Sequence, residues 1–292
     1  MYSFSIKIHI LSKMPIIIII TVLISTFLHA TWNFLIKKSN HPYEYVQLLA
    51  VISGTITLPF AIFLIFTDKF TISGILLSIL SGLVHVFYFY FLGTAYKKAD
   101  LSFVYPIARG TAVALVPLVG LFIIKESVSN ISLVGVFIVF LGILSLGNIT
   151  HIRSVNFNDL FLSLITGIMV SIYTIVDKYA VSLINPFFVF SISSFLGGFL
   201  SITLIDRRIN HFYLVAKNNL RIIFVISFLS AIAYTLVLYA YKFSDVSLVT
   251  PLREVQTAIA AIMGIVLLNE KLKFYKIIGI SFIVIGAILI TY

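Results

Sequence analysis

The chain has 292 residues, of which 61% are hydrophobic and only 10% are charged. Soluble domains carry about 25% charged residues, so this composition excludes a soluble globular protein. No cysteine is present, which excludes disulfides and thiolate metal sites. The 20 Lys and Arg residues outnumber the 10 Asp and Glu residues, but they stand singly or in pairs between apolar runs. That pattern favours contact with lipid headgroups over nucleic-acid binding.

Ten apolar runs follow one another, each long enough for a helix that crosses about 30 Å of hydrocarbon. Strands of a membrane barrel would be about ten residues long with strict alternation, which these runs lack. The first run is longer than the core of a signal peptide, so we expect it to be retained. The predicted spans are Pro15–Ile36, Tyr45–Phe66, Ile72–Leu92, Leu101–Ile124, Ile131–Ile149, Leu160–Ala180, Pro186–Ile205, Leu220–Tyr241, Val246–Leu268 and Phe274–Thr291. We therefore expect an all-α integral membrane protein with ten transmembrane helices.

The second half of the chain repeats the first. The stretch AYKKADLSFVYP, which ends at Pro106, aligns without gaps with AYKFSDVSLVTP, which ends at Pro251. Glu126 and Glu270 then precede similarly spaced glycines in the two halves. We expect one five-helix repeat in residues 1–150 and a second in residues 151–292. Because five is odd, the second repeat enters the membrane in the opposite sense, as in carriers that bind substrate between inverted halves.

These motifs resemble those of the EamA-type carriers of the drug/metabolite transporter superfamily. The sequence is also similar to a subgroup marked by LHATWN in the first helix, YTIVDK in the sixth, and arginine after the two prolines. Some members of that subgroup are associated with the use of phosphonates. The resemblance implies two inverted repeats and transport of a small molecule such as an amino acid, a purine or a drug. It does not select among these substrates.

Charged residues inside predicted spans are the first candidates for a site. Arg109, Arg253 and Glu254 each lie well inside a span, where a charge costs about 2.5–3.5 kcal/mol or more. One interpretation is a central cavity in which the two arginines attract an anionic group of the substrate. The other is an internal ion pair between Glu254 and one arginine that holds the halves together. Both interpretations can be true at once.

Prolines stand just before these charges in both repeats. Pro106 and Pro251 each remove a backbone donor inside a predicted helix. A helix that breaks beside a charge is a common element of transporter sites, so we predict helix breaks at both prolines. A simple packing kink is the alternative.

Two further groups repeat a four-residue spacing in matching helices. His29 and Asn33 share one face of the first helix, with Trp32 beside them, and Tyr173 and Asp177 have the same spacing in the sixth. All five are candidates for substrate binding, and His29 also suggests a proton as the coupling ion. The alternatives are a structural buried histidine and an interfacial anchor formed by Asp177 with the adjacent lysine.

Glu126 and Glu270 lie at span ends, where we expect them to cap the next helix or to pair with Lys125 and Lys271. Enzyme motifs are absent from the sequence, including the zinc-protease, P-loop and nucleophile-elbow patterns. We therefore expect no enzymatic activity and no cofactor. Without a P-loop, transport is expected to run downhill, by exchange, or by coupling to an ion gradient.

The hypothesis is a multi-pass secondary transporter of the inner, cytoplasmic membrane. Its partners would be the lipid bilayer, a small anionic or zwitterionic metabolite, and a coupling proton. A membrane-embedded enzyme or a non-transporting receptor that uses the same cavity is the alternative. The two ends of the chain should share one side of the membrane. Lysine and arginine counts place that side outside, whereas the resemblance places it in the cytoplasm.

Overall fold

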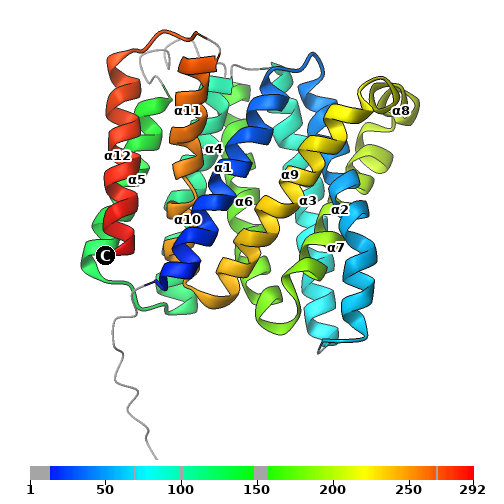
Figure 1. Ribbon diagram of the computed structural model, residues 1–292, viewed down its shortest axis with the longest axis horizontal. Helices are drawn as coiled ribbons and strands as arrows, with labels where there is room; N and C mark the ends of the chain where they lie inside the picture. The colour runs from blue at the N-terminus through cyan, green and yellow to red at the C-terminus, as the bar shows by residue number, and fades with distance from the viewer. Residues whose placement is uncertain (1–13, 69, 99–100, 148–156, 268) are drawn as a thin grey trace, which may run out of the picture.

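The computed structural model describes residues 14–68, 70–98, 101–147, 157–267 and 269–292, and its described elements are all helices (Figure 1). The first half comprises α1 (Ile16–Lys37), α2 (Pro42–Ile65), α3 (Ile72–Lys98), α4 (Leu101–Val119), the π-helical turn η1 (Gly120–Ile124) and α5 (Asn130–Leu146). The second half comprises α6 (Phe157–Leu183), α7 (Pro186–Leu200), the π-helical turn η3 (Ser201–Asp206), α8 (Ile209–Asn218), α9 (Leu220–Phe243), α10 (Val246–Leu252), α11 (Val255–Leu267) and α12 (Phe274–Thr291).

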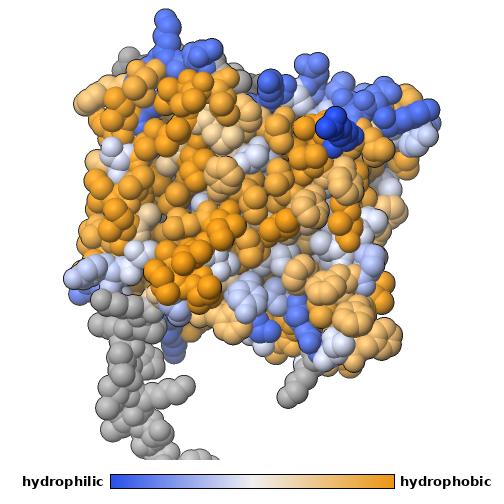
Figure 2. Space-filling model, viewed as in Figure 1, coloured by the Kyte–Doolittle hydropathy of each residue, from blue (hydrophilic) through white to orange (hydrophobic). Residues whose placement is uncertain are grey.

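The predicted membrane spans agree with these helices. Within the described residues, nine helical segments are long and apolar enough to cross a membrane, with α10 and α11 together forming one of them. The remaining predicted span, Ile131–Ile149, corresponds to α5, which has 17 residues. Figure 2 shows apolar side chains covering the middle of the molecule, while hydrophilic side chains gather toward its upper rim. This surface is what a protein surrounded by lipid requires.

One local prediction was wrong, and one connection contains an additional helix. Between the predicted spans that end at Ile205 and begin at Leu220 lies the amphipathic helix α8, whose Phe212 and Val215 are buried against the bundle. Pro106 was expected to break a helix, yet α4 runs through it from Leu101 to Val119. A proline near the start of a helix removes only one backbone hydrogen bond, so the helix can continue past it.

The two halves enter the bundle from opposite ends. In Figure 1 the described start of α1 and the C-terminus lie at the lower end, and α8 lies at the upper end. Helix packing follows the repeat: α3 of the first half lies against α6, and α1 lies against α9, which is the equivalent pair with the halves exchanged. The sixth span therefore packs against the third in the same way as the first span packs against the eighth. The centre of the bundle is built from helices of both halves.

Glycines of the repeat form the contact between α5 and α12. A Cβ atom added at Gly135 would lie 2.7 Å from the carbonyl oxygen of Gly286, and one at Gly142 would lie 2.9 Å from that of Gly279. The helices run in opposite directions, so the first glycine of each faces the second glycine of the other. Small residues let the backbones approach closely, which is how helices associate in a membrane that offers no hydrophobic driving force.

Substitution of Gly135 or Gly286 by alanine is expected to destabilise the protein, because the added methyl group meets the backbone of the facing helix. Overpacking of this kind costs about 1–3 kcal/mol. The measurement is the melting temperature of the purified protein in detergent. Gly110→Ala is the control, since its Cβ would lie 3.7 Å from the nearest side-chain atom. Equal melting of Gly135→Ala and Gly110→Ala would contradict the assigned contact.

Candidate functional site

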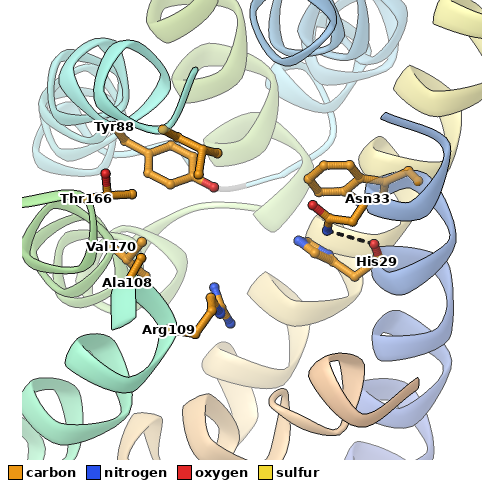
Figure 3. A pocket seen from close by; sticks show the side chains of 9 residues that line it. His29, Asn33, Tyr88, Ala108, Arg109, Thr166 and Val170 are labelled. Atoms are coloured by element: carbon orange, nitrogen blue, oxygen red, sulfur yellow. Dashed lines mark hydrogen bonds between the residues drawn. The ribbon is translucent and has the colours of Figure 1, made fainter. Parts of the chain in front are cut away.

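A pocket lies between α1, α3 and α4 of the first half and α6 of the second (Figure 3). It holds about 330 Å³ of space free of protein atoms, part of it open to the outside. Its lining residues are His29, Trp32, Asn33, Tyr88, Leu92, Ala108, Arg109, Thr166 and Val170.

The pocket lies deep within the bundle. His29 is eight residues from the end of α1 at Lys37, and Arg109 is eight residues from the start of α4 at Leu101. At 1.5 Å per residue, each side chain is roughly 12 Å from the upper end of its helix. Half the thickness of the hydrocarbon core is about 15 Å. The site therefore lies near the middle of the membrane, somewhat closer to the end that carries α8.

The α1 side of the pocket has polar atoms that the protein leaves unused. The rings of His29 and Trp32 lie 4.8 Å apart between centroids, and Asn33 Nδ2 donates to the carbonyl oxygen of His29 at 2.9 Å. In the described part of the chain, neither Trp32 Nε1 nor His29 Nδ1 has a hydrogen-bond partner, although both atoms are buried. Buried polar groups are nearly always hydrogen-bonded. A bound molecule with acceptor atoms would satisfy the indole N–H, which can only donate.

On the opposite side of the pocket, Arg109 forms a buried ion pair with Glu254. Its Nε donates to Glu254 Oε1 at 2.9 Å, and its Nη2 also contacts that oxygen. Glu254 Oε2 accepts a hydrogen bond from Thr257 Oγ1 at 2.9 Å. Both ionised side chains are almost completely shielded from solvent. This pair joins the first half of the chain to the second, as the structural interpretation of these charges requires.

Arg253 has a different environment. Its Nη1 donates to the hydroxyl of Tyr241 at 2.9 Å, and its guanidinium lies over the ring of Tyr234 at 5.3 Å from the centroid. Only 2% of the residue is exposed, yet no described carboxylate lies within 4.0 Å of it. Burial of a cation that has only tyrosines as partners costs desolvation free energy that no ion pair offsets. Arg253 is thus a positive charge that a substrate anion or a more distant carboxylate must offset.

The chain breaks its helix at these two charged residues. Helix α10 ends at Leu252 and α11 begins at Val255, so Arg253 and Glu254 form the turn between them. The break occurs just after Pro251. In the first half, α4 remains continuous past Pro106. The matching segments of the two repeats are therefore not equivalent in shape.

Tyr173 and Asp177 lie outside the lining of the pocket, in a buried cluster beneath it. Asp177 is fully buried and not at the membrane surface, so its interpretation as an interfacial anchor was wrong. The side chains of Asp177 and the next residue diverge. Lys178 Nζ donates instead to the carbonyl oxygens of Tyr241 and Ser244, each at 2.7 Å, at the C-terminal end of α9.

Glu126 and Glu270 occupy opposite ends of the bundle. Glu126 accepts hydrogen bonds from the backbone N–H groups of Val246 and Ser247 at 2.9 and 3.0 Å. It therefore caps α10 of the other half rather than the next helix along the chain. Glu270 pairs with Lys37 and Lys276 at 2.7 and 2.8 Å, and not with its neighbour in sequence.

The ion pairs at Glu270 depend on its charge. Hydrogen bonds from Lys276 and Lys37 lower the pKa of the Glu270 carboxyl group. A group whose pKa is depressed in the folded state stabilises it at neutral pH, and that contribution is lost only as the pH falls through the lowered value. The contact between α1 and the α11–α12 connection is therefore complete under neutral conditions.

The sequence model of the EamA-like transporter family matches residues 16–147 and again residues 159–292. The chain belongs to the EamA-like transporter family. An uncharacterized transporter of Clostridium kluyveri is 24% identical over 266 residues, which cover 87% of this chain and 84% of that protein. A solved crystal structure with 15% identity superposes with a TM-score of 0.70 and covers 93% of this chain and 98% of the other. That likeness concerns the fold alone.

This EamA-like protein is thus a membrane transporter, and its two matched segments agree with the internal repeat seen in the sequence. Sequence reasoning singled out four of the lining residues: His29, Trp32, Asn33 and Arg109. It missed Thr166, which is an ordinary polar residue on a helix that has several. In the described part of the chain, no three His, Asp or Glu side chains gather as a metal site.

Removing one partner of the central ion pair is expected to destabilise the transporter strongly. Glu254→Gln leaves Arg109 buried without a carboxylate, which typically costs about 3–5 kcal/mol. Replacing both residues with methionine should restore much of the stability, because apolar pairs of similar volume often substitute well. Melting curves of Glu254→Gln and of the double methionine variant, compared with that of the wild type, measure this effect.

The control is Arg208→Met, which removes an ion pair at the membrane surface. Arg208 binds Asp206, but its side chain is 46% exposed, so its loss should cost less than about 1 kcal/mol. If Glu254→Gln melted no lower than Arg208→Met, the central pair would not hold the halves together.

Proposed function

We propose that this transporter moves a small anionic or zwitterionic metabolite, such as an amino acid or an organic acid, across the cytoplasmic membrane by alternating access. The observation that carries the proposal is the pair of unsatisfied ring nitrogens, Trp32 Nε1 and His29 Nδ1, on the pocket that Arg109 also lines. In Figure 3, His29 and Asn33 of α1 face Arg109 of α4 and Tyr88 of α3 across the open space.

The pocket chemistry favours a substrate with acceptor atoms. Trp32 and Arg109 can only donate hydrogen bonds, and the hydroxyl of Tyr88 can donate as well, whereas the Thr166 hydroxyl already donates to the carbonyl oxygen of Leu162 at 2.6 Å. Among the described residues, Glu254 is the carboxylate that contacts this lining, and its two oxygens are occupied by Arg109 and Thr257. A carboxylate or phosphonate group would meet several donors at once, and such charge-assisted bonds are about twice as strong as neutral ones.

The apolar part of the lining limits the rest of the substrate. Leu92, Ala108 and Val170 give a small aliphatic surface, and Trp32 and Tyr88 provide aromatic rings. A molecule of a few carbon atoms with one anionic end fits this combination. The pocket is bounded by helices of both halves, which supports movement of the halves about the substrate as the means of transport.

Small anions are expected to bind to the purified transporter and change the fluorescence of Trp32. The chain has a single tryptophan, so its emission reports on the pocket alone. A panel of carboxylates, amino acids and phosphonates at millimolar concentration is compared with amines of similar size. An anion present at 100 times its dissociation constant should also stabilise the protein by about 2.7 kcal/mol. A response to amines but to no anion would contradict the proposed substrate class.

Removal of the indole N–H should weaken anion binding without loss of the fold. Trp32→Phe keeps an aromatic ring beside His29 but cannot donate the missing hydrogen bond. A hydrogen bond to a charged group contributes about 1.5–3 kcal/mol, so affinity should fall roughly tenfold or more. The measurement is the shift of the melting temperature with anion concentration. Tyr239→Phe, at a residue that is 47% exposed on α9, is the control and should bind like the wild type.

A further inference from the structure

Asp177 of α6 is a buried carboxyl group held only by hydroxyls. Its Oδ1 accepts a hydrogen bond from Ser81 Oγ of α3 at 2.5 Å, and its Oδ2 accepts one from the hydroxyl of Tyr234 of α9 at 2.7 Å. None of its surface is exposed. Among the described residues, no Lys, Arg or His nitrogen lies within 4.0 Å of it. The carboxyl group thus lacks the direct cationic partner that a permanently ionised buried group needs.

Hydroxyl partners suit a group that changes its protonation state. A hydroxyl can donate to a carboxylate and can also accept from a carboxylic acid, whereas lysine and arginine can only donate. Ser81 and Tyr234 can therefore satisfy Asp177 in both states by rotating their hydrogens, with the heavy atoms in place. Such a site can bind and release a proton without breaking the packing between α3, α6 and α9.

One tyrosine joins this carboxyl group to the unpaired arginine. The hydroxyl of Tyr234 binds Asp177, and the ring of the same tyrosine lies against the guanidinium of Arg253. Since Arg109 and Glu254 neutralise each other, Arg253 and Asp177 determine the remaining net charge of these four buried side chains. That charge is zero when Asp177 is ionised and positive when Asp177 is protonated. Arg253 directly precedes Glu254 in the chain, and Glu254 binds Arg109 of the pocket lining.

The other charged and titratable groups around Asp177 come from each neighbouring helix. His85 of α3 donates through Nδ1 to the carbonyl oxygen of Ser81 and stacks on Tyr173 at 4.1 Å. Tyr88 connects this cluster to the pocket, since it lines the pocket and also packs against Tyr173. The remaining groups are Lys178 on α6, Tyr241 on α9, Arg253 in the turn between α10 and α11, and Arg109 on α4. Helix α7 has no titratable side chain.

From this geometry we propose that Asp177 is the proton-binding site of the transporter, and that one proton bound there is carried together with the anionic substrate. Protonation of Asp177 leaves the charge of Arg253 uncompensated, and an anion in the pocket then supplies the missing negative charge. Proton and anion therefore favour each other's binding, and by reciprocity each raises the affinity for the other. The proton adds to a carboxyl oxygen of Asp177 on one side of the membrane and returns to water on the other. This inference rests on the proposed anion transport.

Infrared spectroscopy tests the proton site without any substrate. Spectra of the protein in lipid are compared in mildly acidic and mildly alkaline buffer. The wild type should show the C=O band of a protonated carboxyl group that gives way to carboxylate bands as the pH rises. Asp177→Asn should lack that band, and Asp159→Asn, near the start of the same helix, should retain it. Tyr234→Phe should shift its frequency, which keeps the test decisive if Asp177→Asn does not fold.

Identical pH-dependent carboxyl bands in the wild type, Asp177→Asn and Tyr234→Phe would overturn the proton site. A second measurement uses vesicles that contain the transporter and a trapped pH dye, with the panel anion that stabilises the wild type most. We expect the wild type to move protons with this anion, and Asp177→Asn to exchange the anion with no dye response. An unchanged dye response in Asp177→Asn would also overturn the inference. If no panel anion acts, the substrate proposal fails, while the infrared result still decides the role of Asp177.

Discussion

Charge balance in a medium that solvates charges poorly is the constraint on which this structure depends. Two arginines and two carboxyl groups lie buried near the centre of the bundle, yet only Arg109 and Glu254 form an ion pair. Arg253 and Asp177 remain apart, and one tyrosine connects them, with its ring under Arg253 and its hydroxyl bound to Asp177. An ion pair fixes the halves to each other, whereas a separated pair leaves a charge that a ligand can alter. The centre thus contains one ion pair that holds the halves together and one separated pair whose net charge can change.

The inverted repeat places these groups, and sequence differences between the halves make them functional. The close glycine contact between α5 and α12 holds one edge of the bundle in a fixed, nearly symmetric arrangement. Symmetry ends at the site, where the four-residue spacing that gives His29 and Asn33 on α1 gives Tyr173 and Asp177 on α6. The first pair borders an open pocket, and the second is packed among aromatic rings. Equivalent helix positions therefore line a polar pocket in the first half and hold a buried carboxyl group in the second.

Much of this architecture could be predicted from the sequence because long apolar runs and a gapless repeat are strong physical signals. They identified the spans and the opposite insertion of the halves, and the cost of buried charge drew attention to Arg109, Arg253 and Glu254. Which carboxylate pairs with which arginine depends on side-chain directions across helices distant in sequence. The inward direction of Asp177 could not be read beside Lys178, because only about half a helical turn separates a lipid-facing position from a buried one.

The ends of the bundle show how two nearly identical repeats can differ within one structure. Lys125 and Asn269 share a left-handed backbone, and the next residues, Glu126 and Glu270, donate their N–H groups to matching glycines. The side chains nevertheless differ: Glu126 caps a helix of the other half, whereas Glu270 binds two lysines. An inverted-repeat carrier must differ at its two ends whenever it opens to one side only. Here the backbone keeps the symmetry and the carboxylates break it, so side-chain partners at these ends distinguish one half from the other.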